Sequence, residues 1–128
     1  MKIENQVCTA QQGKRLMELG ISNESLFHHV IEETALGIER RVAYLASPPN
    51  NHIPAFTVAE LGVMMPSGYD TMRLEADLNK WRGYDLDGAD CPSDFFDTEA
   101  ECRAAMIIFL LENGHITAAK CNKRLLNA

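Results

Sequence analysis

The sequence predicts one α+β domain over residues 1–128, in which a small antiparallel sheet made of two hairpins is packed by about four helices. Three observations predict it. A threonine stands at the start of each of four helix-like stretches, and two regions have the β-branched, aromatic or alternating character of strand pairs. With 128 residues, 46% hydrophobic and 23% charged, the chain has the balance of one globular domain with a buried core.

The first predicted element is a helix over Thr9–Leu19. Thr9 is a suitable N-cap, and Gly20 follows where helices often end in the left-handed conformation. Gly13 weakens this prediction, because glycine inside a helix costs about 1 kcal/mol relative to alanine.

A hairpin is expected next, with strands over Ser25–Ile31 and Arg40–Leu45 and a loop over Glu32–Glu39. A continuous helix over Glu33–Leu45 is the alternative, because its Ala, Leu, Glu and Arg residues tolerate helix. The following segment, Ser47–Pro54, is predicted to be a loop, since its prolines disfavour both a helix and a central strand.

A short helix follows Thr57, which forms a capping-box pattern with Glu60, and Pro66 ends it. Its expected inward-facing residues are Val58, Leu61 and Met65.

The second hairpin is predicted from an alternating strand, Thr71–Asn79, paired with Trp81–Leu86 across a tight turn at Asn79 and Lys80. Alternation places four apolar residues of the first strand on its inner face: Met72, Leu74, Ala76 and Leu78.

The strongest helix prediction is Thr98–Asn113, with a capping box at Thr98 and Glu101 and a stop at Gly114. A final helix, Ala118–Leu126, is capped by Thr117.

The helix after Thr98 is apolar on nearly every side. One face carries Ala104, Ile107, Ile108 and Leu111, and the opposite face carries Met106, Phe109 and Leu110. If nothing in the chain covers the second face, its residues form an oligomer interface, and a dimer is the favoured homo-oligomer.

Charge and hydropathy restrict the partners and the location. The net charge of −6 argues against generic binding to nucleic acid, which requires a basic surface. The longest strongly apolar run, Ala104–Leu111, is far shorter than the roughly 20 residues that span a bilayer. The first residues show no secretory signal, so a cytoplasmic location is expected, with the four cysteines reduced and mostly buried.

No sequence signature of catalysis or metal binding is visible. The chain has neither a Gly-x-Ser-x-Gly nucleophile motif nor a phosphate-binding loop, and its cysteines lack the close pairing of a zinc site. His28 and His29 would point to opposite faces of a strand, one partly buried and one exposed. We therefore assign no catalytic residue, metal or cofactor, although a Cys–His pair that meets only in the fold leaves an enzyme as an open alternative.

An acidic run is the first candidate binding feature. Seven acids and no Lys or Arg lie between Asp85 and Glu101. Asp87, Asp90 and Asp94 are the candidate residues for binding a basic partner. The alternative is a solvated loop that leads into a helix.

A second candidate is a pocket for a phosphorylated small ligand, since arginine binds phosphate and aromatic rings stack on bases. Its residues would be Arg40, Arg41, Tyr44, Trp81 and Tyr84. The alternative is solubilising charge and half-buried aromatic packing.

The segments VCTAQQGKRLMELGISNESLF, FTVAELGVMMP and DTEAECRAAMIIFLLENGHITAAKCNKRL resemble a loose family of small bacteriophage and prophage proteins of gut bacteria. They cover about half of the chain, and the resemblance implies a helix–hairpin–helix–hairpin–helix order. Residues 32–51 depart from the family pattern. The family has no assigned activity, so no functional residue is carried over.

These features favour a non-enzymatic, phage-type accessory protein that acts by binding, with a host-defence protein or a nucleotide-type defence signal as its target. Two alternatives stand beside it. One is a small enzyme or nucleotide-processing protein with an unrecognised site, and the other is a structural or regulatory interaction module.

Overall fold

A computed structural model describes residues 2–45, 52–73, 80–85, 92 and 94–127, in which each hairpin is flanked by helices along the chain. The fold is α+β, as predicted, with four α-helices and two small antiparallel sheets in the described residues. The elements are η1 (Ile3–Asn5), α1 (Ala10–Glu18), β1 (Phe27–Thr34), β2 (Gly37–Tyr44), β3 (Ile53–Pro54), α2 (Val58–Met64), β4 (Tyr69–Arg73), β5 (Trp81–Asp85), α3 (Glu99–Glu112) and α4 (Ala118–Leu126).

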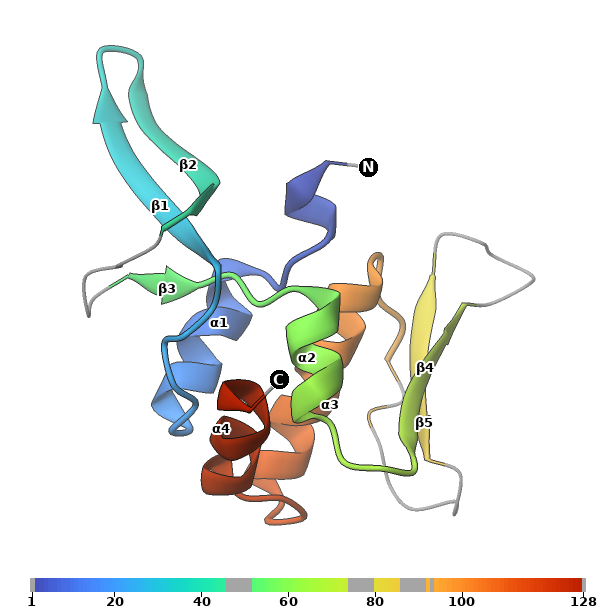
Figure 1. Ribbon diagram of the computed structural model, residues 1–128. Helices are drawn as coiled ribbons and strands as arrows, with labels where there is room; N and C mark the ends of the chain where they lie inside the picture. The colour runs from blue at the N-terminus through green and yellow to red at the C-terminus, as the bar shows by residue number, and fades with distance from the viewer. Residues whose placement is uncertain (1, 46–51, 74–79, 86–91, 93, 128) are drawn as a thin grey trace.

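The two hairpins do not join into one sheet. The first sheet has the strand order β2-β1-β3 and the second consists of β4 and β5. Figure 1 shows the helices between them, with β1 and β2 extending away on one side and β4 and β5 on the other. The separation follows from α2, which stands between the hairpins in the chain and packs against both α3 and α4.

The hydrophobic core lies among the helices. α3 is central, because it packs against α1 and α2 and also against β4 and β5. The buried core cluster consists of Cys8, Leu16, Ile21, Phe56, Leu61, Met64, Ala100, Ala104, Ile107 and Cys121. The helices therefore supply most of the buried apolar surface, and the projecting β1–β2 hairpin supplies little.

All four threonine caps are confirmed. In each, the hydroxyl accepts a hydrogen bond from the amide three residues later, at 3.1 Å for the first three helices and 3.3 Å for α4. The pairs are Thr9 with Gln12, Thr57 with Glu60, Thr98 with Glu101, and Thr117 with Lys120. Such caps stabilise a helix by about 1 kcal/mol each, which explains why the helix starts were predictable.

The first hairpin is confirmed, with longer strands and a tighter turn than expected. β1 and β2 pair from Phe27 and Tyr44 out to Thr34 and Gly37, which excludes the alternative helix. The Thr34 hydroxyl accepts from the Leu36 amide at 3.2 Å and donates to the Gly37 carbonyl at 3.0 Å. Gly37 has a φ of 121°, a conformation that favours glycine and closes the turn.

The loop predicted over Ser47–Pro54 is wrong at its end. Ile53 and Pro54 form β3, which pairs antiparallel with His29 and His28 of β1. β3 is an edge strand, where a proline is tolerated because its missing N–H is not needed by another strand. The earlier part of that predicted loop lies outside the described residues, apart from His52.

The second hairpin is confirmed in its pairing but not in its details. Arg73 pairs with Trp81, and Asn79 of the tight turn predicted at Asn79 and Lys80 lies outside the described residues. Met72 was expected inside and is 45% exposed. The inner face instead carries Gly83, whose lack of a side chain lets β5 approach Met106 of α3. Residues 74–79, which include the other three predicted inner residues, lie outside the described part.

Candidate functional site

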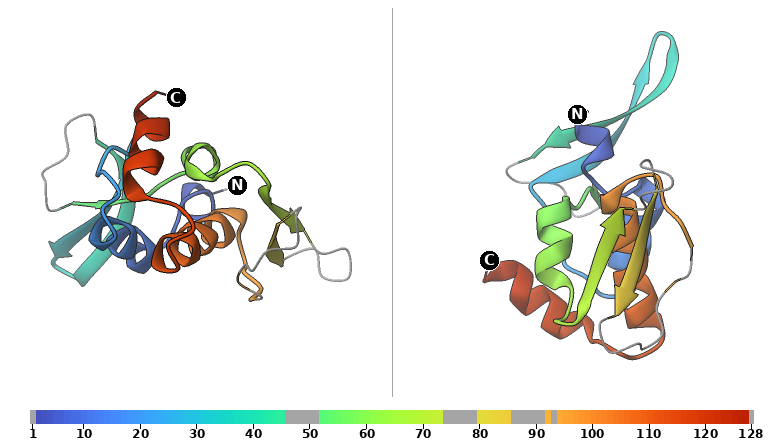
Figure 2. Two further views of the ribbon diagram at one scale, coloured as in Figure 1. Left: turned by 90° about the horizontal axis from the view of Figure 1, so that it is seen from below. Right: turned by 90° about the vertical axis from the view of Figure 1, so that its right-hand side faces the viewer.

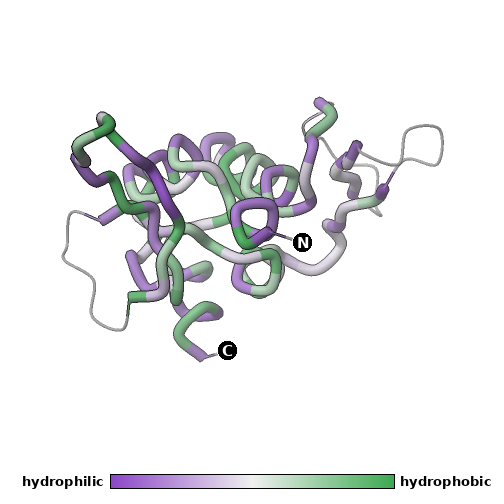
Figure 3. The backbone as a smooth tube through the Cα atoms, turned by 90° about the horizontal axis from the view of Figure 1, so that it is seen from above, coloured by the Kyte–Doolittle hydropathy of each residue, from purple (hydrophilic) through white to green (hydrophobic). Residues whose placement is uncertain are grey.

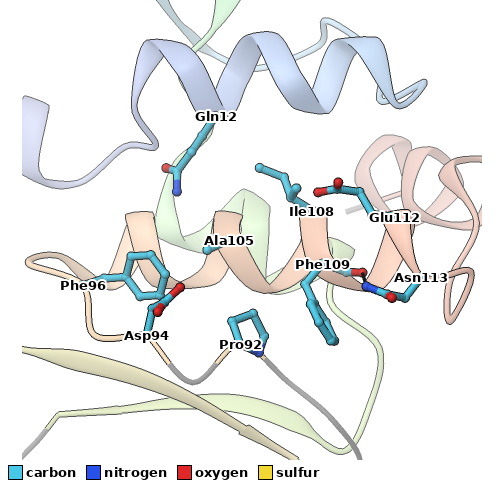
Figure 4. A pocket seen from close by; sticks show the side chains of 9 residues that line it. All are labelled: Gln12, Pro92, Asp94, Phe96, Ala105, Ile108, Phe109, Glu112 and Asn113. Carbon is cyan, nitrogen blue, oxygen red and sulfur yellow. Dashed lines mark hydrogen bonds between the residues drawn. The ribbon is translucent and has the colours of Figure 1, made fainter.

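An open groove of about 370 Å³ runs along α3. Three parts of the chain form it: α1, the segment that precedes α3, and α3 itself (Figure 4). Its lining residues are Gln12, Pro92, Asp94, Phe96, Ala105, Ile108, Phe109, Glu112 and Asn113.

Backbone and side-chain hydrogen bonds hold the walls of the groove. Phe96 and Trp81 exchange two backbone hydrogen bonds, of 2.7 and 2.9 Å, which tie the segment before α3 to β5. On the opposite wall, the Gln12 side chain donates to the Glu101 carbonyl at 2.9 Å, which ties α1 to α3. One wall of the groove is thus tied to β5 and the other to α3.

The groove has an apolar floor and an acidic rim. Ala105, Ile108 and Phe109 form the floor, and Asp94 and Glu112 are the carboxylates of the rim. Glu112 accepts a charged hydrogen bond from Arg15 at 3.3 Å. Asp94 is exposed and has no ion-pair partner among the described residues. The floor can bury an apolar group while the rim attracts a cation.

More negative charge lies at the start of α3. Burial raises the pKa of Glu101, and the neighbouring Asp97 raises it further. Asp97 pairs with Lys80, and Glu99 lies 3.5 Å from the Arg103 guanidinium. These two acids are therefore partly neutralised, which leaves Asp94 as the carboxylate most available to a ligand at this end.

Binding of a basic partner by the acidic run stays a prediction, and the structure places only one of its three candidate residues. Asp94 lines the groove, whereas Asp87 and Asp90 lie outside the described residues. Nothing local in the sequence shows that the acidic run and the apolar helix face each other.

The predicted oligomer face on α3 is largely covered. Met106 and Leu110 are fully buried within the single chain, so they cannot form an exposed patch. The second sheet covers Met106, whose sulfur would lie 2.2 Å from a Cβ added at Gly83. Phe109 is only partly buried and lies in the groove.

The predicted phosphate pocket is not assembled. Arg40, Arg41 and Tyr44 lie on β2, whereas Trp81 and Tyr84 lie on β5 in the other sheet. Figure 1 places these two sheets on different sides of the helices. The order of residues along the chain does not show how far apart the two hairpins lie in the fold. The two hairpins were wrongly expected to share one sheet.

Three of those five residues contact neighbours on their own hairpin. Arg41 pairs with Glu32 across the hairpin at 2.6 Å, and the Arg73 guanidinium lies 5.7 Å from the centre of the Trp81 ring. Tyr44 packs edge-on against Phe27, with ring centres 6.2 Å apart. The structure thus gives Arg41, Tyr44 and Trp81 local packing roles.

An exposed apolar surface on the first hairpin was missed. Cross-strand pairing places eight residues on one face, which we call the hairpin face: Phe27, His29, Ile31, Glu33, Ile38, Arg40, Val42 and Tyr44. Ile31, Ile38 and Tyr44 are 56%, 67% and 62% exposed. Figure 2 shows the hairpin projecting beyond the helices, and Figure 3 shows hydrophobic positions interspersed with hydrophilic ones along it. The alternation was present in the sequence, but only the register shows that both strands direct apolar residues to one face.

The two adjacent histidines point in opposite directions, as predicted, but neither is exposed. His28 Nε2 lies 3.0 Å from Asn23 Oδ1, and His29 Nε2 lies 2.8 Å from the Cys8 carbonyl oxygen. Burial lowers the pKa of both histidines. Within the described residues, no group of three or more His, Cys, Asp or Glu side chains could hold a metal ion.

Neither Cys8 nor Cys121 is an activated nucleophile. Cys8, Cys102 and Cys121 are buried, as small hydrophobic residues are. Burial raises the pKa of Cys8 to about 12 and also raises that of Cys121. A thiol with a raised pKa is poorly nucleophilic at neutral pH, because the thiolate is the reactive form.

Comparison with protein-family models, with curated proteins and with solved structures found no match. Among the described helices, none is both long and apolar enough to cross a membrane.

Proposed function

We propose that the protein acts by binding, and that the groove along α3 receives a basic segment of a partner protein. The observation that carries this proposal is an apolar floor bordered by two carboxylates, Asp94 and Glu112. An aliphatic side chain of the partner would lie over Ala105 and Ile108, and arginines or lysines beside it would pair with the rim. The net charge of −6 favours approach of a basic partner.

A nucleotide-type signal is the weaker candidate ligand. The described residues that line the groove include two carboxylates and no lysine or arginine. Carboxylates repel phosphate, which is normally bound by arginine, lysine or backbone amides. The arginines proposed for phosphate binding lie on the hairpin and share no pocket with Trp81 and Tyr84.

The biological setting of this binding protein stays a prediction. The sequence resemblance favours a bacteriophage accessory protein, and a basic segment of a host-defence protein would then be the target. A regulatory module that binds a basic segment of another phage protein would use the groove in the same way. The chemistry of the groove is therefore compatible with a host target and with a phage target.

The test is the fluorescence anisotropy of a labelled peptide in which leucine is flanked by arginines, titrated with the protein. Asp94→Asn with Glu112→Gln should weaken binding at least about tenfold, because both charge-assisted contacts are lost. Ala105→Leu, which fills the floor, should also weaken it. Glu39→Gln, an exposed carboxylate change on the hairpin, is the matched control.

Two further readouts decide the outcome. Binding should fall steeply with added salt, since exposed charges are screened within about 8–10 Å. A peptide with glutamates in place of the arginines should not bind. Equal binding of the acidic peptide, or unchanged affinity in the Asp94 and Glu112 double variant, would refute the proposed groove function.

A further inference from the structure

The hairpin face differs from the other face of the same two strands. On the opposite face, Glu32 and Arg41 already pair with each other at 2.6 Å. On the hairpin face, Arg40 and Glu33 are exposed, and neither has an ion-pair partner among the described residues. One face is thus polar and internally paired, whereas the other is apolar with two unpaired charges.

The apolar residues of the hairpin face form a stripe in which each exposed isoleucine is paired across the strands with a charged residue. Ile31 lies opposite Arg40, and Ile38 lies opposite Glu33. Directly opposite residues in an antiparallel pair have Cβ atoms about 5 Å apart, so these side chains are neighbours. Exposed apolar stripes of this kind usually mark an interface, since burying them from water is favourable.

The charges on this face are self-complementary. It carries one unpaired cation, Arg40, and one unpaired anion, Glu33. They lie on opposite strands, in successive cross-strand pairs of this face, and are therefore diagonal neighbours. A second copy, rotated by a two-fold axis lying between the two faces, presents the same apolar stripe and the same two charges. In that arrangement each Arg40 can meet a Glu33 of the other copy, and two such pairs form at once.

We propose that the hairpin face is the contact surface for a second copy of this chain, in a two-fold dimer in which Arg40 of each copy pairs with Glu33 of the other. The apolar stripe supplies the buried area and the two charge pairs fix the register. This proposal goes beyond the groove function and is independent of it, because the hairpin and the groove share no residue.

Sedimentation equilibrium at micromolar concentration tests the proposal with a charge swap. The wild-type chain should have a dimer mass. Arg40→Glu creates a face with two anions, and Glu33→Arg creates a face with two cations. Each should weaken dimerisation by roughly tenfold or more, because the like-charge contact occurs twice in a two-fold dimer.

Mixing the two variants gives the decisive result. An equimolar mixture of Arg40→Glu and Glu33→Arg should recover the dimer mass, because every contact between unlike chains is again complementary. Glu39→Arg makes the same charge change on the opposite face and should leave the dimer intact. Ile38→Ser, which alters no charge, should also weaken the dimer.

A wild-type monomer would overturn the proposal, and so would single variants that remain dimeric. A mixture that stays monomeric would refute the pairing of Arg40 with Glu33. All the substituted side chains are exposed, so the far-ultraviolet circular dichroism of each variant should match that of the wild type. Failure of this dimer would leave the peptide affinity of the groove unaffected.

Discussion

Gly13 lies where α1 contacts β3. A Cβ built on Gly13 would lie 2.2 Å from the Pro54 carbonyl oxygen and 2.9 Å from Ile53 Cγ2. In the sequence this glycine only weakened the helix prediction. In the fold it allows the helix backbone to approach the edge strand closely.

Gly13→Ala should therefore lower the free energy of unfolding by about 1–3 kcal/mol, the usual range for overpacking. This is opposite to the gain of about 1 kcal/mol expected from helix propensity alone. Urea unfolding measures the change, with Gln11→Ala at an exposed position of α1 as the control. A more stable Gly13→Ala protein would show that the contact does not limit packing.

Two buried histidines give a pH dependence of stability. Burial is the largest cause that lowers the pKa of His28 and of His29 below the ordinary value of 6.5. His28 Nδ1 has no hydrogen-bond partner in the described structure, so a proton added there would be buried without an acceptor. The neighbouring His52 and His29 oppose protonation of His28, and Glu60 favours it.

The direction in which stability changes with pH follows from the difference in proton binding between the folded and unfolded chain. The unfolded chain binds protons at these histidines more readily than the folded chain, so their contribution to stability is complete above about pH 6.5 and is lost as pH falls below it. Urea unfolding between about pH 7 and pH 5 should show a decrease that is smaller in His29→Gln, whose amide can still donate to the Cys8 carbonyl. An identical slope in that variant would contradict a contribution from His29.

At the scale of the element, Glu60 joins α2 to the start of β1. Its Oε1 accepts from the Thr57 amide at 2.9 Å and from the Ser25 hydroxyl at 2.9 Å. Its Oε2 accepts from the Leu26 amide at 3.3 Å. The helix cap was predictable because Thr57 and Glu60 are three residues apart, whereas the contacts with residues more than 30 positions away were not.

Glu60→Ala should lower the free energy of unfolding by about 2–3 kcal/mol, because hydrogen bonds to a charged group contribute more than neutral ones. Glu60→Gln keeps an oxygen acceptor and should cost less. Glu24→Ala, at an exposed acid close to the same strand, should change stability little. Equal effects of the alanine changes at Glu60 and Glu24 would show that the link does not hold the two elements together.

Elements with local signals were predicted well. The capped helices begin at the expected residues. Each N-terminus is fixed by a hydrogen bond between a threonine hydroxyl and the backbone amide three residues later. The covering of α3 was not predictable. Met106 is buried because Gly83 brings a distant strand against the helix, and no local pattern shows that contact.

At the scale of the whole molecule, two surfaces of different character lie on different parts of the fold. The groove combines α1, α3 and the segment before α3, so it exists only once segments about 90 positions apart meet. The sequence had already indicated Asp94 as a residue for a basic partner, and Ile108 and Phe109 as apolar residues of a helix. It gave no indication that all three line one groove.

The central claim is that this groove binds a basic segment. The most direct test is a titration of ¹⁵N-labelled protein with the arginine-flanked leucine peptide, followed by amide chemical shifts. Saturable shifts are expected at Gln12, Ala105, Ile108 and Phe109, and unchanged shifts at Ile31 and Ile38 on the hairpin. Unperturbed α3 signals at peptide excess, or shifts confined to the hairpin, would contradict it.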